Sequence, residues 1–347
     1  MIHRVHIGLD TESLIIFSLL ALLGLALDLL AHRHDKPISI KAACIWILFW
    51  IGCGVGFGIF LKYHFSSETA SLYFAGYAFE MALSVDNLFA FMAIFSWFGL
   101  KSGLIHRVLF WGVIGAVIFR LVFVLAGTTL FALGPYVEVI FALLIILSAI
   151  LMLKRTSYEE KNDFSQHLAY KIVSSVLPVY PKFYGHSFFV SQKHVNRELK
   201  KEENRHIELK RTGAFFATPL FICLAIVELS DVMFAFDSVP AVIAVSKDPF
   251  IVYSAMIFAL LGLRSMYFVL DALRNSLVHL EKAVIVLLFF VAVKLLLGAS
   301  LKLFGYGLEI SIYTSLTIIA TVLSLGILAS LFCKAKNFNG KNKVTRI

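Results

Sequence analysis

The chain has 347 residues and a mass of 38.8 kDa; 60% of its residues are hydrophobic, 15% are charged, and its mean hydropathy is +0.87. Soluble domains are about half apolar and a quarter charged, so this composition excludes a soluble globular protein, and it also excludes disordered, collagen-like and coiled-coil chains. We therefore expect an all-α polytopic membrane protein in which residues 1–347 form a single integral membrane domain.

Nine apolar runs along the chain reach the length that a helix needs to cross the hydrocarbon core of a bilayer, which is about 20 residues. They cover residues 13–31, 40–61, 72–98, 108–133, 137–153, 214–245, 250–270, 283–301 and 310–333. The third, fourth and sixth runs are longer than a perpendicular span, so we expect tilting or an internal break in them.

The distribution of lysine and arginine predicts how these spans are oriented. Alternate connections and the C-terminal tail hold 24 of the 31 basic residues, the other connections and the N-terminus hold 4, and 3 lie inside spans. Positive residues favour the cytoplasmic side, so we expect the N-terminus outside and the C-terminus in the cytoplasm of a bacterial inner membrane. The net charge of +9 then marks a solvated cytoplasmic face beside anionic lipid, and we expect no binding of nucleic acid.

The connection of residues 154–213 is the one stretch in the sequence with room for structure outside the membrane. Its pattern predicts an amphipathic helix at 164–177, a short strand within 187–191 and a charged helix at 196–210. We expect this segment to be a cytoplasmic loop between the fifth and sixth spans, and a surface to which soluble protein partners could be recruited.

Five carboxylates lie well inside two of the apolar runs, and they are the candidate functional groups. The third run carries Glu80 and Asp86, and the sixth carries Glu228, Asp231 and Asp237. A charge near the bilayer centre costs about 2.5–3.5 kcal/mol even on the mildest scale, so five such residues must face an interior site.

Helical spacing places polar side chains beside some of these carboxylates. Glu80, Ser84 and Asn87 share one helical face, and Glu228 shares a face with Asp231. Pro240 lacks an amide proton, so it predicts a kink near Asp237 and Ser238 that frees a backbone carbonyl. These oxygens would make a cation site of the kind that broken helices form in transporters.

Basic residues inside the spans are the expected counter-ions. Arg120, Arg264 and Lys294 bring three positive charges against five negative ones, which leaves an excess of two negative charges. A bound divalent cation or protons would relieve that excess. Two alternatives remain open, namely purely structural salt bridges and a proton relay without metal.

The ligand types restrict the ion. Carboxylate, amide, hydroxyl and carbonyl oxygens suit Mg²⁺, Ca²⁺ or Mn²⁺. The four cysteines form no CxxC motif and are expected to be packing residues. The sequence contains no catalytic or phosphate-binding motif, so we do not expect an enzyme, and the ion is the cargo of the protein and not a resident cofactor.

Spans three and four resemble spans six and seven at an offset of 145 residues. Asp86 corresponds to Asp231, the Phe-Ala-Phe triplet at 89–91 to the one at 234–236, and Arg120 to a position next to Arg264. Under the predicted orientation the two units run in opposite directions. This inverted-topology repeat is typical of alternating-access transporters, whose site lies at the repeat interface.

The acidic motifs, EMALSVDNLFAF at 80–91 and TPLFICLAIVELSDVMFAFDSVPAVIAVS at 218–246, resemble those of the TerC family, which includes Alx-type membrane proteins. Residues 106–120 and 253–280 carry further resemblance. The resemblance implies an inner-membrane protein linked to metal-ion homeostasis and tellurite resistance, with members similar to manganese exporters.

These observations lead to one functional expectation and one alternative. We expect export of a divalent cation, Mn²⁺ first, with coupling to protons as a further expectation. Six residues would bind the ion, with four others as auxiliary groups: Glu80, Asp86, Asn87, Glu228, Asp231 and Asp237, assisted by Ser84, Ser238, Arg120 and Arg264. The alternative is a membrane scaffold of a stress-resistance complex that recruits cytoplasmic partners through residues 154–213.

Overall fold

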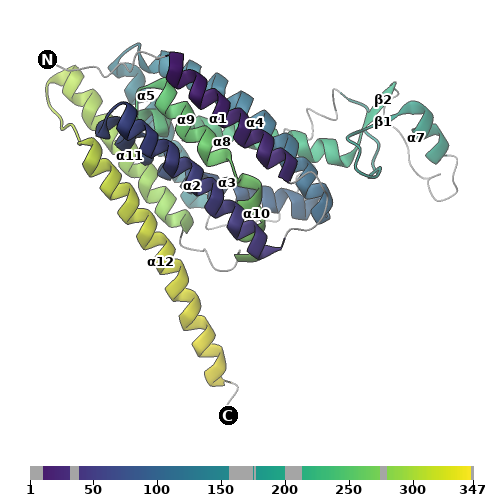
Figure 1. The fold of residues 1–347 in the computed structure, drawn as a ribbon. Coiled ribbons are helices and arrows are strands. Elements are labelled where there is room, and N and C mark those ends of the chain that lie inside the picture. Colours follow the sequence, from purple (N-terminus) through teal and green to yellow (C-terminus); the bar gives the residue numbers. More distant parts are fainter. Residues whose placement is uncertain are drawn as a thin grey trace.

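The computed structural model describes residues 11–31, 39–155, 175, 177–199, 213–273 and 280–344. The helices are α1 (Thr11–Ala31), α2 (Ile40–His64), α3 (Ser67–Trp97), α4 (Ser102–Phe131), α5 (Pro135–Arg155), α7 (Gln192–Leu199), α8 (Pro219–Val245), α9 (Pro249–Leu260), α10 (Leu263–Leu273), α11 (Leu280–Phe304) and α12 (Ile312–Val344). Two short strands, β1 (Phe189–Ser191) and β2 (Phe215–Ala217), complete the described elements. All but α7 and the strands form one helical bundle, from which the last part of α12 extends (Figure 1).

The prediction of an all-helical membrane protein is confirmed, although the number of spans is not. By length and composition, six of the described helices could each cross a membrane, namely α2, α3, α4, α8, α11 and α12. Helices α9 and α10 qualify together as a pair bent by 50°. The described apolar stretches of α1 and α5, Ile15–Asp28 and Pro135–Leu147, are shorter than the roughly 17 residues that a span needs. The structure thus supports six or seven spans, and nine stays a prediction.

Two of the long runs depart from the predicted boundaries for local reasons. The sixth run was expected to be helical from residue 214, but residues 215–217 form β2, and α8 begins only at Pro219. Thr218 is extended and donates its hydroxyl hydrogen to the carbonyl of Ser187 (2.8 Å), while Pro219 supplies the fixed φ that starts a helix. The seventh run is interrupted at Leu261 and Gly262, where Gly262 has a φ of +84°.

The sixth run has no break at Pro240, because α8 is one continuous helix from Pro219 to Val245 with Pro240 inside it, and the kink predicted there stays a prediction. Pro240 still leaves the carbonyl of Phe236 without an amide donor four residues later. Interhelical contacts on both faces of α8 hold the helix together across this position, with Val239 and Ile243 against Gly127 and with Val242 against Gly76.

The described part of the loop between α5 and α8 forms a small separate unit. Strands β1 and β2 pair in antiparallel register, with Val190 opposite Phe216. Four buried side chains, Tyr180, Val190, Val195 and Phe216, make its core. The unit lies to one side of the helical bundle (Figure 1). The predicted strand within 187–191 is confirmed, the charged helix begins earlier than expected at Gln192, and the helix predicted at 164–177 lies almost wholly outside the described residues.

Helices α4 and α8 run parallel to each other through the middle of the bundle. Gly112 faces Val227, Gly115 faces Glu228, and Gly127 faces Val239, so the contacts advance in the same direction along both helices. The first halves of the two helices belong to one cluster of buried side chains and the second halves to another. Both helices carry charged residues at the boundary between the two apolar clusters.

Candidate functional site

Arg120 lies at this boundary and connects α4 to α3 and α8. Its side chain is buried, and its Nη1 donates to Oε1 of Glu80, which is also fully buried. Its Nη2 lies 3.8 Å from Oδ1 of Asp231. The contact with Glu80 is a hydrogen-bonded ion pair, whereas the contact with Asp231 is longer than a hydrogen bond. One guanidinium group therefore lies between two carboxylates and forms a hydrogen bond with only one of them, Glu80.

Glu228 completes an acidic pocket beside this pair. Its carboxylate lies against Gly115 of α4, at a place that any side chain larger than hydrogen would occupy. A small pocket separates α4 from α8 here, and its walls come from α3, α4, α8, α9 and α10: Phe91, Leu109, Gly112, Val113, Ala116, Val227, Glu228, Asp231, Leu260 and Leu263. Glu228 and Asp231 are the two acidic groups in an otherwise apolar wall.

Several buried oxygen atoms of the acidic segments of α3 and α8 have no hydrogen-bond partner among the described residues. They are Oε2 of Glu80, Oδ2 of Asp231, Oε2 of Glu228, and the hydroxyls of Ser84 and Ser238. Buried polar atoms are nearly always partnered in folded proteins, so such a set calls for an explanation. Two carboxylates, Glu80 and Asp231, lie beside Arg120, and Glu228 lines the same pocket as Asp231. With all three carboxyl groups ionised, the described part of the site would carry an excess of two negative charges.

The predicted ligands are brought together only in part. Glu80, Asp231 and Arg120 meet, and Glu228 lines the same pocket as Asp231. Ser84, Asn87 and Ser238 are buried on the same helices. The side chains of Asp86 and Asp237 lie outside the described part of the chain. Within that part, no three His, Cys, Asp or Glu side chains come together closely enough to hold a metal ion.

Arg264 does not face these carboxylates, which corrects the expectation drawn from the sequence. Its Nε and Nη2 lie 3.0 and 2.9 Å from Oδ2 of Asp28, and its Nη2 also donates to the backbone carbonyl of Asp28. Both side chains are buried, with 0% and 2% exposure. Asp28 lies near the end of the apolar run 13–31, beside a charged turn, where an acidic residue ordinarily marks the membrane boundary. No pattern in the sequence therefore pairs it with Arg264.

A third ionic cluster, also unforeseen, joins α5, α11 and the connection between α8 and α9. Glu138 is buried, and its Oε1 accepts from Lys302 and from Lys247, the latter at 3.2 Å. Lys294, expected as a counter-ion of the acidic motifs, forms no ion pair with any described side chain.

Helix α4 carries Arg120 and contacts the other two ionic groups, so positions along α4 give the spacing of the three groups. Arg264 lies over the ring of Phe110 (5.5 Å), and Lys247 lies over the ring of Phe131 (5.2 Å). Arg120 lies ten residues after Phe110 and eleven before Phe131. At a rise of about 1.5 Å per residue these steps are each about 15 Å, and together they approach the thickness of the hydrocarbon core, about 30 Å. The Arg120 site is therefore midway between two ion-paired ends.

The comparisons with known proteins give the same family that the acidic motifs resemble. The model of the family described as "Integral membrane protein TerC family" matches residues 65–337. The chain is 54% identical over 334 residues to "Tellurium resistance protein TerC" of Serratia marcescens, covering 95% of this chain and 96% of that protein. It is 52% identical to the protein of the same name from an Alcaligenes species, with the same coverage.

A more distant relative carries the second name that the sequence suggested. The chain is 29% identical over 291 residues to "Putative membrane-bound redox modulator Alx" of Photorhabdus laumondii subsp. laumondii, covering 82% of this chain and 84% of that protein. No solved structure matches the chain. The family match over residues 65–337 and the two relatives above 50% identity show that the chain belongs to the TerC family of integral membrane proteins.

Proposed function

We propose that this chain is a membrane transporter that exports a divalent metal cation, Mn²⁺ first, through the acidic site around Arg120. The observation that carries the proposal is the grouping of three carboxylates, the buried Glu80 and Asp231 and the partly buried Glu228, around a single arginine whose one positive charge cannot balance them. Buried carboxylates without counter-charge are costly, and uptake of a cation or of protons relieves that cost. Two relatives are named for tellurium resistance, and that name fits a protein that acts on ions at a membrane.

The two carboxylates of the pocket are the groups best prepared to receive the cation. Glu80 is engaged by Arg120, while Asp231 is 3.8 Å from the same guanidinium and keeps one oxygen without a partner. Glu228 lies one helical turn away and also keeps one unpartnered oxygen. Oxygen ligands of this kind suit Mn²⁺, Mg²⁺ and Ca²⁺. Asp86, Asn87 and Asp237 are proposed to complete the coordination, with Ser84 and Ser238 as auxiliary ligands.

Arg120 would set the resting state of the site. It neutralises part of the charge when no cation is bound, and a divalent ion would compete with it for Asp231. We propose that coupling to protons follows from the same competition, because a proton on Asp231 or Glu228 removes charge as a metal ion does. The orientation with the N-terminus outside and the C-terminus in the cytoplasm is part of this proposal.

Flux of Mn²⁺ in proteoliposomes tests the proposal. Asp231→Asn and Glu228→Gln keep the shape of each side chain and remove its charge, so each is expected to reduce Mn²⁺ flux at least about ten-fold. Glu138→Gln, which neutralises a buried carboxylate about 15 Å away along the bundle, is the matched control and should retain flux. Wild-type flux in both pocket variants would refute the assignment of the site. Competition by Mg²⁺ and Ca²⁺ would rank the ions.

One observation favours a second candidate function. The unit formed by β1, β2 and α7 has its own buried core and lies to one side of the bundle (Figure 1). We propose as the alternative that it recruits soluble partners in a stress-resistance complex. Deleting residues 159–210 separates the two: lost tellurite resistance with intact Mn²⁺ flux favours recruitment, while intact resistance in the deletion excludes it.

A further inference from the structure

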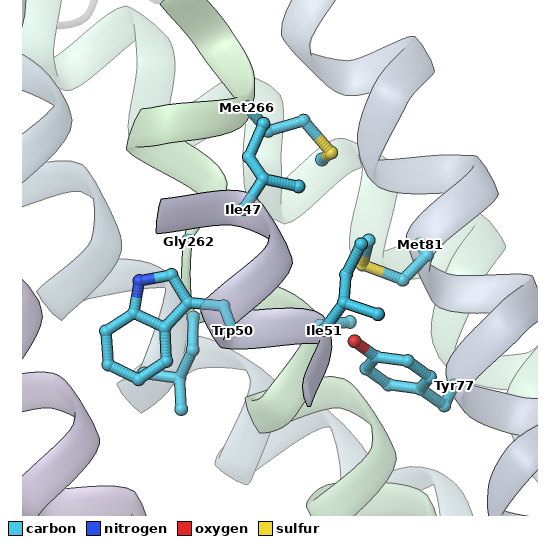
Figure 2. Close-up of a pocket in the computed structure, with 9 residues that line it drawn as sticks. Ile47, Trp50, Ile51, Tyr77, Met81, Gly262 and Met266 are labelled. Carbon is cyan, nitrogen blue, oxygen red and sulfur yellow. The ribbon is translucent and has the colours of Figure 1, made fainter. Parts of the chain in front are cut away.

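The seventh apolar run is broken directly beside the acidic pocket. Helices α9 and α10 meet at 50°, and Leu261 and Gly262 form the joint. On one side of the joint, Leu260 and Leu263 line the pocket that contains Glu228 and Asp231. On the other side, Leu261, Gly262 and Met266 line a second small pocket against Trp50 and α3 (Figure 2). The joint therefore borders a small pocket on each side.

The joint requires glycine at position 262 and packs against side chains and backbone of α1 and α2. Gly262 has a φ of +84°, which residues with a side chain rarely adopt. A Cβ atom at this position would lie 2.6 Å from Cδ1 of Trp50, and Figure 2 shows the indole beside the joint. A Cβ atom on Gly24 of α1 would likewise lie 2.9 Å from Leu261. Helices α1 and α2 thus hold the backbone on which α10 would turn.

Beyond the joint, α10 is fastened to α1 through one ion pair. Arg264 follows Gly262 by two residues and contacts the carboxylate and the carbonyl of Asp28. The same helix lies along the first half of α4, where Phe268 stacks on His106 at 4.2 Å and Arg264 lies over Phe110. Releasing Arg264 would free α10 from α1, while its packing against α2, α3 and α4 would be the contacts that remain.

We propose that α10 is a gate that turns about Gly262, that the Asp28–Arg264 ion pair holds it closed, and that its movement opens the Glu228–Asp231 pocket toward the end of the bundle where α4 begins. Leu263 is both a wall of the pocket and the first residue of α10, so a rotation of α10 removes that wall. The gate rests on the proposed function in one respect, since it describes how the same site is reached. Under the predicted orientation it opens toward the cytoplasm.

Accessibility of the pocket to a thiol reagent tests the gate without any metal ion. The background is a chain in which Cys44, Cys53, Cys223 and Cys333 are replaced by alanine, with Ala116→Cys as the reporter in the pocket wall. The gate is released by Asp28→Asn combined with Arg264→Gln, which removes both charges and so leaves no buried charge unpaired. A cationic methanethiosulfonate is applied to inside-out and right-side-out membrane vesicles.

The gate predicts that labelling of the reporter from the side where α4 begins rises about ten-fold in the neutral pair, because the open population increases. The reversed pair, Asp28→Arg with Arg264→Asp, should return labelling to the wild-type rate. Glu138→Gln, which breaks the ionic cluster at the other end of α4, should leave labelling from this side unchanged.

Unchanged labelling in the neutral pair would overturn the gate, as would an equal rise from both sides, which indicates general loosening of the bundle. Labelling of the reporter does not require a transported ion, so the gate and the transport of Mn²⁺ can be refuted independently of each other. If labelling responds as expected while wild-type protein carries no Mn²⁺, the gate stands and the cargo assignment falls. If Mn²⁺ is carried and labelling does not respond, the gate falls alone.

Discussion

The ion pair between Arg120 and Glu80 gives the most quantitative prediction. Both side chains are buried, at 1% and 0% exposure, and they join α4 to α3 in the middle of the bundle. Replacing only the arginine, as in Arg120→Gln, leaves Glu80 charged and without a counter-ion and also removes the nearest cation from Asp231. Breaking a buried pair from one side costs about 3–5 kcal/mol.

The double variant separates the pair from the rest of the site. Arg120→Gln with Glu80→Gln places two neutral amides in contact, so it should recover about 2 kcal/mol of the loss relative to Arg120→Gln alone. Recovery stays incomplete because Asp231 still lacks its cation. In thermal terms, the single arginine variant should melt roughly 5–15 °C below wild type, and the double variant between the two.

Tryptophan fluorescence during heating in detergent measures these shifts, since the chain has four tryptophans. Glu80→Gln alone, together with Arg120→Gln, the double variant and wild type, completes a double-mutant cycle from which the coupling of Arg120 to Glu80 is obtained. Additive effects of the two single variants would refute the reasoning, because they would show that neither charge depends on the other.

Two further predictions use matched pairs of variants. Gly115→Ala should lower Mn²⁺ affinity about ten-fold and destabilise the protein by about 1–3 kcal/mol, because its methyl group would occupy the place of the Glu228 carboxylate. Gly112→Ala, whose methyl group would meet only Val227 at 3.7 Å, should be neutral within about 0.5 kcal/mol. Titration with Mn²⁺ and heating in detergent measure both, and equal effects of the two substitutions would contradict the pocket geometry. Glu138→Gln should lower the apparent Tm at low ionic strength by a few degrees, less so at about 0.5 M salt, because Lys247 and Lys302 are partly exposed. Asp271→Asn, at an exposed position near the end of α10, is its control, and a salt-independent difference would argue against an ionic role for Glu138.

Composition and hydrophobic run length were sufficient to predict an all-helical membrane protein and the residues that form its helices. They could not show where a helix breaks inside an apolar run. The glycine of the break at Gly262 lies against Trp50, more than two hundred residues earlier in the sequence, and α8 packs around Pro240 against α3 and α4. Such tertiary contacts leave no local signal.

The candidate site, like the fold, was predicted only in part. A charge inside an apolar run is conspicuous, so Glu80, Arg120, Glu228 and Asp231 could be found, and the structure gathers them. Charges near the end of a run resemble ordinary boundary residues, so Asp28 and Glu138 were missed although both are buried in ion pairs. For the same reason the partner of Arg264 was assigned wrongly.

The continuity of α4 has a mechanical consequence. Helix α4 is unbroken from Ser102 to Phe131. It contacts Arg264 near its beginning, carries Arg120 in its middle and contacts Lys247 of the Glu138 cluster at its end, so one rigid helix connects the three ionic groups. Tilting a rod about its middle moves its two ends in opposite directions, and Arg120 is at that middle. A displacement of either end of α4 would therefore reach Arg120 without any change of shape within α4 itself. An insertion that makes the helix flexible between Arg120 and Phe131 would leave each end able to open without reference to the other.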